Sequence, residues 1–360
     1  MSQAMNFSLH GEAIPTNGNH MLDEVCDHFV EHSKVERSGD SVTLTSEFGT
    51  ASIRLVQGRL LIALGCPTQE SLDLSRNVLA EHLFYFAGEE PFELTWRAPP
   101  VRGALPNLHD VTVVSTADIT PRMRRVTFRC ADIAPFVGGA MHVRLLVPPQ
   151  GREPVWPHYR ADGRIGWPEG EDELLVRIYT IRAVDAERGE LSIDFFQHPA
   201  SDVQTPGADF ARDARPGDRA AILGPGGGGL PAARSIFVAG DESALPAIAR
   251  IAAEAPEGTR MQAIIEVEDE CEEQPLLTDG SLEIRWLHRK EYPTGMRGAL
   301  AEAAGKAIAD IEPDTFVWIG CEKADVRFLR DLLKRRNHDR KKMYAAWYWE
   351  RTAGPDASCI

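Results

Sequence analysis

The stretch RIYTIR, residues 177–182, decides which fold this sequence is expected to adopt. It lies within LLVRIYTIRAV, residues 174–184, a run that is rich in β-branched and aliphatic residues and is typical of a β-strand. A strand packed only for stability would alternate apolar and polar residues, but this one carries two arginines, a tyrosine and a threonine. Spacing by two puts Arg177 and Tyr179 on one face. An edge strand with solvated polar side chains has the same pattern, so the flanking sequence must decide.

Six strand-like runs, separated by turn residues, occupy residues 108–230. They are DVTVVST, RRVTFRC, MHVRLLVPP, LLVRIYTIRAV, GELSIDFFQH and RAAILGP. No long helical pattern interrupts them, which predicts a small antiparallel β-barrel. The proline- and charge-rich insertion of residues 150–172 is expected to be a loop, and GPGGGG (224–229) a hinge to the next domain.

Strand and helix patterns alternate over residues 234–354. SIFVAG, MQAIIEV, LEIRWLH, TFVWIGC and MYAAWYWE have the character of buried strands, and ALPAIARIAAEA, RGALAEAAGKAIADI and KADVRFLRDLLKRR that of helices. This alternation predicts a parallel, doubly wound α/β sheet.

Residues 1–98 form a separate small α+β module in this interpretation. A helix is expected over 19–32, a three-stranded meander over 41–66, a helix over 68–88 with Thr68 as N-cap, and a strand over 92–96. The proline-containing segment APPVRGALPN, 98–107, is the predicted linker to the barrel.

Composition excludes several classes of protein. The 360 residues carry a formal net charge of −15, which argues against a general nucleic-acid binder. The six cysteines are scattered without a CxxC pair, which disfavours a local zinc or iron–sulfur site. Neither a signal peptide nor a membrane span is visible, so a soluble cytoplasmic protein is expected.

A barrel followed by a doubly wound domain suits an enzyme that holds one cofactor across the barrel and a second nucleotide at the sheet edge. An arginine of RIYTIR can pair with a pyrophosphate, and Tyr179 can stack on a flavin or form a hydrogen bond with a ribose. Asp194, Phe196 and His198 alternate onto one face of the next strand. PGADFA (206–211) is expected to begin a short helix whose N–H groups favour an anion.

In SIFVAGDESALPAIARI (235–251), Gly240 ends a strand just before a helix, which can present backbone N–H groups to a phosphate. The stretch lacks a GxGxxG motif, and Asp241 and Glu242 add negative charge that does not favour a bare phosphate.

The ordered combination of RIYTIR, DFFQH, GPGGG, VAGDESALPAIARI, WLHR, WIGCE and YWE resembles the siderophore-interacting proteins. These are flavin-dependent ferric-siderophore reductases of the ferredoxin reductase superfamily. The likeness covers residues 108–354, with ITPRMRRVTF and MHVRLLVPP matching the start of the barrel. The N-terminal module is similar to a small α+β domain of unassigned function, with HLFYFAGEEPFELTW carrying that likeness.

The resemblance implies that FAD binds the barrel and that NADPH or NADH binds the sheet edge as electron donor. It implies that Arg177 faces the pyrophosphate, Tyr179 the isoalloxazine or ribitol, and Thr180 the flavin ring edge. The other implied cofactor-binding residues are Asp194, Phe196, His198, Ala208, Phe210, Ala211, Gly240, Asp241, Glu242, Ala244, Leu245 and Pro246. Here Pro199 stands where the family has a glycine, and Glu350 where it has an arginine that follows Tyr-Trp.

No protein acid or base is obligatory in the implied reaction, since the flavin carries the electrons to a ferric siderophore. An often anionic chelate calls for local positive charge. The candidates for substrate binding are Arg125, Arg144, Arg182 and Arg351, together with Arg122 and Arg124. An ordinary surface arginine is the alternative interpretation of each arginine on the barrel. Arg289 and Lys290 could meet a 2′-phosphate and favour NADPH.

Other functions fit the same residues. A general flavin oxidoreductase with another acceptor, or a flavoprotein fed by a ferredoxin, would have nearly the same sequence. The N-terminal module could be a docking or dimerisation unit. His28 and His32, at i and i+4 of its first helix, could bind a divalent metal, but a solvated helix face is the favoured interpretation because the sequence places no third ligand.

Overall fold

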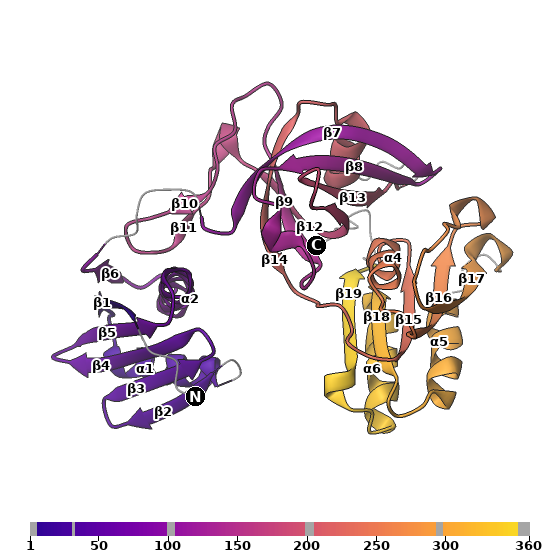
Figure 1. Ribbon diagram of the computed structural model, residues 1–360. Helices are drawn as coiled ribbons and strands as arrows, with labels where there is room; N and C mark the ends of the chain where they lie inside the picture. The colour runs from indigo at the N-terminus through magenta and orange to yellow at the C-terminus, as the bar shows by residue number, and fades with distance from the viewer. Residues whose placement is uncertain (1–5, 31–32, 99–104, 199–204, 293–297, 352–360) are drawn as a thin grey trace. The chain divides into compact units, whose positions relative to one another are not determined.

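The computed structural model describes residues 6–30, 33–98, 105–198, 205–292 and 298–351. The chain divides into two compact units, one of Met1–Pro106 with Val155–Gly170, and one of Asn107–Pro154 with Glu171–Ile360. Figure 1 labels the helices and strands of both units. No helix in the described ranges is long and apolar enough to cross a membrane.

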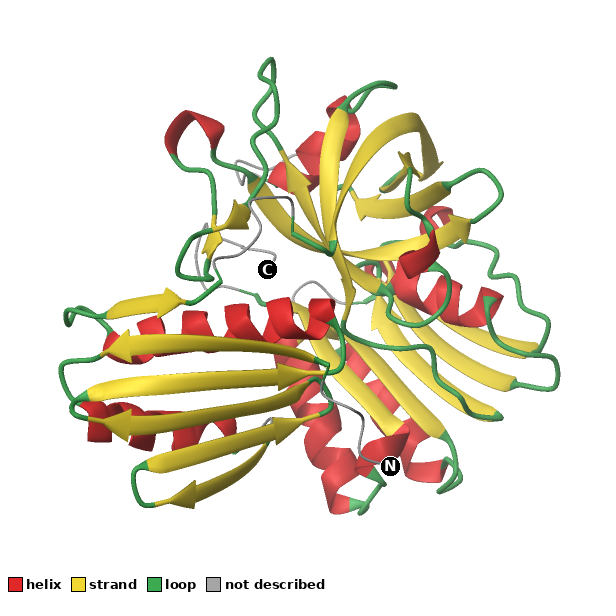
Figure 2. Ribbon diagram, turned by 60° about the vertical axis from the view of Figure 1, so that its left-hand side comes forward, coloured by secondary structure: helices red, strands yellow, loops and turns green. Residues whose placement is uncertain are grey.

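The N-terminal domain is a six-stranded antiparallel sheet with two helices on one face (Figure 2). The strand order is β2-β3-β4-β5-β1-β6. The elements are β1 (Phe7–Ile14), α1 (Gly18–Phe29), β2 (Lys34–Ser38), β3 (Ser41–Ser46), β4 (Gly49–Val56), β5 (Arg59–Cys66), α2 (Gln69–Ala87) and β6 (Glu93–Trp96).

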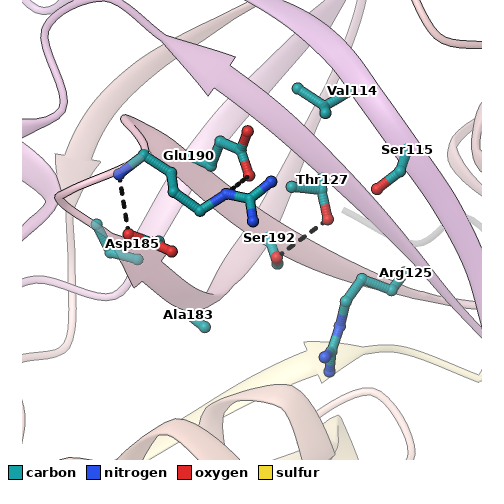
Figure 3. A pocket seen from close by; sticks show the side chains of 10 residues that line it. Val114, Ser115, Arg125, Thr127, Ala183, Asp185, Glu190 and Ser192 are labelled. Atoms are coloured by element: carbon teal, nitrogen blue, oxygen red, sulfur yellow. Dashed lines mark hydrogen bonds and ion pairs between the residues drawn. The ribbon is translucent and has the colours of Figure 1, made fainter.

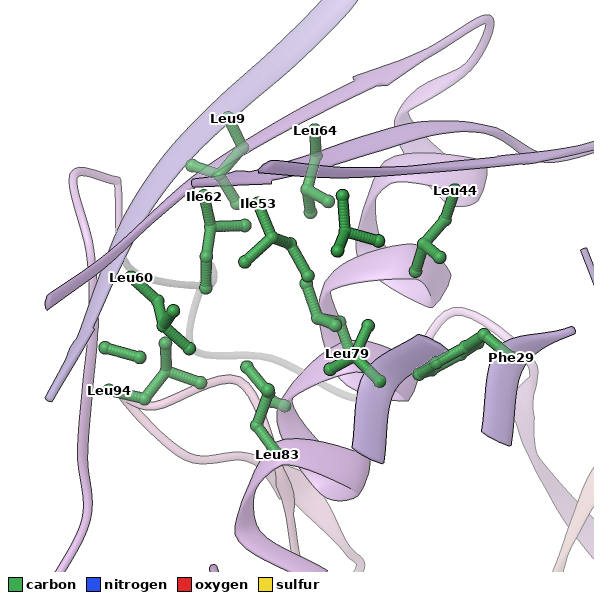
Figure 4. Close-up of a cluster of buried hydrophobic side chains, with 14 of the residues drawn as sticks. Leu9, Phe29, Leu44, Ile53, Leu60, Ile62, Leu64, Leu79, Leu83 and Leu94 are labelled. Atoms are coloured by element: carbon green, nitrogen blue, oxygen red, sulfur yellow. The ribbon is translucent and has the colours of Figure 1, made fainter. Parts of the chain in front are cut away.

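One apolar core lies between this sheet and its helices (Figure 4). Phe29 of α1 and Leu79 and Leu83 of α2 meet alternate side chains of the central strands, such as Ile53 and Ile62. Burying a side chain of this size stabilises the fold by about 1.5–3 kcal/mol. These contacts explain why the apolar residues of the helices recur at helical spacing and those of the strands at every second position.

Thr68 is the N-cap of α2 as predicted, and it accepts a hydrogen bond from Ser71 N. Helix α1 begins at Gly18, one residue before its predicted start, and its N-cap Asn17 accepts a hydrogen bond from His20 N. Gly88, with φ of 58°, ends α2 as expected. The end of the predicted first helix, with His32, lies outside the described residues.

The insertion of residues 150–172 contains more than the predicted loop. Strands β10 (His158–Tyr159) and β11 (Ile165–Gly166) form a short antiparallel hairpin, followed by a 3₁₀ turn, η2 (Gly170–Asp172). The hairpin segment Val155–Gly170 belongs to the same compact unit as the N-terminal domain.

The second unit begins with a closed six-stranded barrel of order β12-β13-β8-β7-β14-β9. All six predicted strands are present, and neighbouring strands pair antiparallel. They are β7 (Leu108–Thr120), β8 (Met123–Cys130), β9 (His142–Val147), β12 (Leu175–Asp185), β13 (Glu190–Phe196) and β14 (Arg219–Gly226), with η1 (Ala134–Phe136) and α3 (Pro206–Asp213) beside them.

The rest of the unit is the predicted doubly wound domain. Its five parallel strands have the order β17-β16-β15-β18-β19. Helix α4 packs in one core on one face of the sheet, and α5 and α6 pack in a second core on the other face. The elements are β15 (Ser235–Asp241), α4 (Leu245–Ala253), β16 (Arg260–Val267), η3 (Glu270–Glu272), β17 (Ser281–His288), η4 (Arg289–Glu291), α5 (Ala299–Asp310), β18 (Phe316–Glu322), α6 (Lys323–Arg335), η5 (Arg340–Lys342) and β19 (Met343–Trp349).

Candidate functional site

Strand β12 changes its partner in the middle of the RIYTIR motif. Residues 175–180 pair with β9, whereas β13 pairs with β12 from Ile181 onward. The register with β9 places Arg177 and Tyr179 on the face of β12 that turns toward the barrel core. Tyr179 packs on Phe195, with 4.4 Å between ring centroids. The half-strand that carries Arg177 and Tyr179 therefore has one backbone edge without a ladder partner among the described residues.

The first turn of α3 lies against Tyr179. A Cβ atom on Gly207 would come within 1.7 Å of Tyr179 Oη, so glycine is needed for this close approach. The N-cap Thr205 makes no side-chain cap hydrogen bond, which leaves N–H groups of the first turn for another acceptor. The Arg177 guanidinium donates to Val176 O at 2.8 Å. A helix start, a tyrosine and an arginine are the kinds of group that hold a pyrophosphate.

The remaining predicted residues of α3 hold the helix on the barrel. The Phe210 ring stacks on Phe128 with 6.3 Å between centroids, and Ala211 is fully buried in the barrel core. Ala208 is also buried. These side chains position the start of the helix, and a ligand would meet its backbone there.

Asp194 is engaged by an arginine. Its buried carboxylate accepts hydrogen bonds from Arg125 Nε at 2.6 Å and Nη2 at 2.8 Å. Arg182 lies farther away, with its Nε 4.0 Å from Asp194 Oδ2. That Nε is buried and has no hydrogen-bond partner in the part of the chain that the structure describes. Burial lowers the pKa of Arg182. A buried guanidinium donor left in this state is one that a bound anion would satisfy.

Side chains of β13 alternate between the two faces of the strand. Ile193 and Phe195 point into the barrel core, so Asp194 and Phe196 lie on the outer face. Phe196 packs against the core of the α/β domain and contacts the His198 ring edge-on, with 4.9 Å between centroids. Burial lowers the pKa of His198. The predicted residues of β13 therefore line the side of the barrel that meets the α/β domain.

A polar cavity of about 460 Å³ lies on the outer surface of β7, β8, β12 and β13 (Figure 3). The hydroxyls of Thr127 and Ser192 lie 3.3 Å apart on its wall, and Arg188 Nε donates to Glu190 at 3.1 Å. Arg125 is the one predicted site residue that lines it. The cavity therefore adjoins the Asp194 pair but does not contain the RIYTIR side chains Arg177, Tyr179 and Thr180.

Thr180 belongs to a hydrogen-bonded cluster of side chains that the sequence patterns did not predict. Its hydroxyl lies 3.3 Å from His142 Nδ1, and His142 Nε2 lies 3.2 Å from Tyr348 Oη and 3.4 Å from Tyr344 Oη. Burial lowers the pKa of His142 to about 4, so the imidazole is neutral at physiological pH. The cluster joins β9 and β12 of the barrel to β19, which carries Tyr344 and Tyr348.

Arg250 fixes α4 of the α/β domain against the barrel. It is 1% exposed, and its guanidinium donates to Ile181 O at 3.1 Å and to Phe136 O at 3.2 Å. Its Nε pairs with Glu254 at 2.8 Å. The backbone next to Thr180 is therefore held by the helix that follows Gly240, and this connects the two predicted binding regions.

Gly240 lies where β15 leads into α4. A Cβ atom there would come within 2.8 Å of Ala244 Cβ and of Gly320 O, so glycine allows the helix and β18 to approach. Ala244, Leu245 and Pro246 are buried in the core of the domain. Only the backbone at the start of α4 is available to a ligand from this part of the motif.

The two acidic residues after Gly240 both interact with other side chains of the domain. Asp241 accepts hydrogen bonds from Ser243 N at 2.9 Å and from Trp349 Nε1 at 2.7 Å. Glu242 is buried and pairs with Arg289. Burial raises the pKa of Glu242 to about 7 in spite of that arginine.

Further carboxylates lie at the same edge of the sheet. Burial, followed by the negative charge of Glu322, raises the pKa of Asp325 to about 6. Arg289 also pairs with Glu266 at 3.0 Å, and Lys290 pairs with Asp269. Both cations predicted to meet a 2′-phosphate are thus already neutralised by carboxylates.

The predicted substrate arginines have different surroundings. Arg144 is exposed and lies directly across from Ile178 of the RIYTIR strand, which is itself 49% exposed. Arg125 is held by two hydrogen bonds to Asp194, and Arg182 lies near the same carboxylate without a hydrogen bond from its Nε. Arg351 stands over the Trp349 ring at 5.5 Å.

The two additional surface arginines are paired within the second unit. Arg122 pairs with Glu268 at 3.1 Å, and Arg124 pairs with Asp118 at 2.6 Å and donates to Ala211 O at 2.8 Å. Of the six arginines, Arg144 and Arg351 are exposed and make no ion pair with the described residues.

Known families match three parts of the chain. Residues 112–229 match the siderophore-interacting FAD-binding domain, and residues 233–352 match the siderophore-interacting protein domain. Residues 12–97 match an uncharacterised family of proteins conserved in bacteria, DUF2218.

Individual proteins show the same relationship. The ferric vibriobactin reductase ViuB of Vibrio cholerae is 27% identical over 245 residues, which cover 66% of this chain and 88% of that protein. A siderophore utilization protein from T. fusca is 34% identical, with a TM-score of 0.58, over 71% of this chain and 97% of the other. The ferredoxin reductase of carbazole 1,9a-dioxygenase shares the fold, with 13% identity and a TM-score of 0.50 over 69% of this chain and 70% of the other.

The barrel and the parallel sheet have the ferredoxin-reductase-like arrangement, and the two matched domains cover them from residue 112 to residue 352 with a three-residue gap. The chain therefore belongs to the siderophore-interacting protein family and carries its FAD-binding domain, preceded by a DUF2218 domain.

Proposed function

We propose that this chain is a FAD-dependent reductase of ferric siderophores, which takes electrons from NADPH or NADH and releases Fe²⁺ inside the cell. The observation that carries the proposal is the grouping of Arg177, Tyr179 and the uncapped start of α3 within the family's FAD-binding domain. The named function of ViuB supports the same reaction class.

The residues present suit a flavin dinucleotide. Arg177 and the first turn of α3 would hold the pyrophosphate, Tyr179 would lie against the ring or ribitol, and Thr180 would meet the ring edge. The unsatisfied Nε of Arg182 offers another donor to an anionic group. Bound FAD would supply the transfer of electrons from a two-electron donor to a one-electron acceptor.

Reduction is an effective way to release iron from a siderophore. Hard oxygen ligands bind Fe³⁺ far better than the larger and less charged Fe²⁺. One NAD(P)H carries two electrons and can reduce two ferric ions, giving NAD(P)⁺, two Fe²⁺ and one proton. On the protein side, exposed Arg144 beside Ile178 provides positive charge and an apolar surface near the RIYTIR strand, which suit an anionic chelate.

The acidic sheet edge favours a second candidate for the donor. Asp241 and Glu322 form no ion pair within the described residues and would repel the pyrophosphate of NADPH or NADH, as would Glu242 and Asp325 once ionised, and Arg289 is already paired. Weak nicotinamide binding would leave room for a protein donor such as a ferredoxin. The overall proposal stands with either donor, but the route to the flavin differs.

The test is an anaerobic absorbance experiment on protein reconstituted with FAD. NADH or NADPH is added, followed by a ferric hydroxamate and a ferrous chelator. We expect the oxidised flavin spectrum to disappear, then to return as coloured ferrous complex accumulates. If the flavin stays oxidised with both nucleotides but is reduced by reduced ferredoxin, the electron donor is a ferredoxin and not a nicotinamide nucleotide.

Two other outcomes would change the proposal further. Turnover with free flavins or quinones but not with ferric chelates would favour a general flavin oxidoreductase. Failure to bind FAD at all would contradict the proposed function.

A further inference from the structure

The hairpin of residues 155–170 belongs by sequence to the connection between barrel strands β9 and β12, yet it packs on the N-terminal domain. We propose that the N-terminal domain is an intramolecular binding module whose ligand is this hairpin. Its role is to hold the connection between the strand of Arg144 and the strand of RIYTIR. This inference does not depend on the proposed reductase activity.

The N-terminal domain binds the backbone of the hairpin turn at three points. Trp96 Nε1 donates to Asp162 O at 2.7 Å, and Asn77 Nδ2 donates to Gly163 O at 3.2 Å. In the opposite direction, Ile165 N donates to Glu81 Oε1 at 2.9 Å. Contacts to backbone groups on both sides of a turn recognise its conformation as well as its composition.

Two arginine–aromatic contacts, one from each partner, surround these hydrogen bonds. The guanidinium of Arg164 on the hairpin lies 3.4 Å from the centroid of the Phe84 ring on α2. The guanidinium of Arg76 on α2 lies 5.1 Å from the centroid of the Tyr159 ring on the hairpin. Arg76 is only 4% exposed and is paired with Asp73 at 2.8 Å. Such cation–π contacts are strengthened by the burial of the cation.

Hydrogen bonds within the hairpin fix the conformation of its turn. Arg160 N donates to Arg164 O at 2.7 Å, which closes the turn, and Asp162 holds Arg164 through Nε at 3.0 Å and Nη2 at 2.8 Å. Gly163 has φ of +92°, and a Cβ atom there would lie 3.0 Å from Trp96 Nε1. The turn therefore requires glycine both for its own conformation and for the close approach of Trp96.

The binding surface is a stripe on α2 beside its fully buried leucines, and one member of the stripe, Phe84, also packs against the edge of the core. Arg76 and Phe84 are eight positions apart, and Asn77 and Glu81 are four apart, so the four lie on one side of the helix. The core of the domain is filled from α2 by Leu72, Leu79 and Leu83. The donors, acceptor and aromatic ring of the stripe match groups of the hairpin one by one.

The test is to cut the covalent linker in the whole protein. A protease recognition sequence is placed between residues 100 and 103, and the cut chain is passed over a size-exclusion column at micromolar concentration. We expect the N-terminal fragment to elute with the rest of the chain. Separation of the two wild-type fragments would overturn the proposal.

A matched pair of hairpin variants tests the interface itself. Arg164→Ala removes the contact with Phe84, and we expect the cut fragments to bind roughly tenfold more weakly. Arg160→Ala is the matched control, because it also removes an arginine side chain from the hairpin. The ion pair of Arg160 is with Glu169, at 3.9 Å, and both residues belong to the hairpin segment. Arg160→Ala should leave fragment binding unchanged, and equal weakening by both variants would contradict the proposal.

Hydrogen exchange provides a readout in the uncut chain, where folding of each variant can be checked by the exchange of the core strands. The amide of Ile165 should exchange slowly, and Glu81→Ala should accelerate it at least tenfold while leaving β3, β4 and β5 protected. Rapid exchange of Ile165 in the wild-type protein would show that the hairpin is not held.

Discussion

The two regions of the second unit that are predicted to bind nucleotides differ in charge. On the barrel, Arg177 is paired with no carboxylate among the described residues, and Arg182 and Arg125 share the single carboxylate of Asp194. At the sheet edge, Glu242 and Glu266 share Arg289, whereas Asp241 and Glu322 form no ion pair within the described residues. The barrel site therefore has excess positive charge, and the sheet edge has excess negative charge.

The difference indicates how tightly each region can hold a pyrophosphate. Like charges at a binding site oppose association, and unpaired cations favour it. We therefore expect FAD to remain on the barrel through many turnovers, whereas a nicotinamide nucleotide would bind weakly and leave quickly. Weak binding suits a donor, which must depart after each transfer, but not a resident cofactor.

The largest expected effect concerns the pair that orders the barrel site. Arg125→Ala leaves the buried Asp194 carboxylate without its bidentate partner, so the free energy of unfolding should fall by about 3 kcal/mol in urea denaturation. Arg129→Ala is the control on the same strand, because its pair with Glu190 involves a largely exposed arginine and should contribute less than about 1 kcal/mol. Similar losses in both variants would mean that Asp194 does not depend on Arg125.

The second prediction concerns the acidic edge and its pH dependence. The pKa of Glu242 is about 7 in the folded protein, against 4.5 as its ordinary value. Between these values the folded state keeps a proton that the unfolded state has lost, so stability falls as pH rises from about 5 to 7.5. We expect the wild-type protein to lose about 2–3 kcal/mol over this range relative to Glu242→Gln.

The control for this experiment is Glu283→Gln, which changes an exposed carboxylate on β17 and should keep the wild-type pH profile. Parallel profiles for the wild-type protein and the Glu242→Gln variant would show that Glu242 is ionised in the folded protein throughout, and that the edge carries still more negative charge.

The third prediction concerns the contact between α3 and Tyr179. Gly207→Ala places a Cβ atom where the Tyr179 hydroxyl lies, so the ring or the helix start must move. We expect FAD to bind the apoprotein at least about tenfold more weakly in a fluorescence titration, a loss of about 1.4 kcal/mol. Gly229→Ala is the matched control, because nothing lies within 4 Å of the added Cβ. Unchanged affinity in the Gly207 variant would place the flavin elsewhere.

The smallest expected effect concerns the choice between NADPH and NADH. Lys290 is exposed and already paired with Asp269, so Lys290→Ala should change the ratio of kcat/KM for the two nucleotides by less than about twofold. A selective loss of NADPH turnover of tenfold or more would show that Lys290 leaves Asp269 to bind a 2′-phosphate.

The sequence patterns were sufficient for the barrel and the parallel sheet, because their strands bury β-branched and aliphatic side chains in regular order. They missed β1 and β2. In β1, Gly11 interrupts the apolar pattern because the Trp96 ring occupies the space of a side chain: a Cβ atom on Gly11 would lie 2.6 Å from Trp96 Cε3. Strand β2, KVERS, is a mostly exposed edge strand with little apolar alternation to detect.

At the candidate site, motif positions identified residues but not their partners. Asp194 was assigned to the cofactor on its position in the strand, whereas the structure pairs it with Arg125 sixty-nine residues away. His142, Tyr344 and Arg250 were missed for the same reason, since their contacts join strands and helices from distant parts of the chain. The hairpin of residues 155–170 carries too short a pattern to predict a binding surface.

The most direct test of the charge difference is the salt dependence of both affinities. FAD is titrated into the apoprotein, and NADH or NADPH into the FAD-bound protein under anaerobic conditions, at low and high sodium chloride concentrations. Screening should weaken FAD binding, because its site is positive, and should leave nicotinamide binding unchanged or strengthen it, because its site is negative. If added salt weakens both affinities to the same degree, the two regions do not differ in the way the structure indicates.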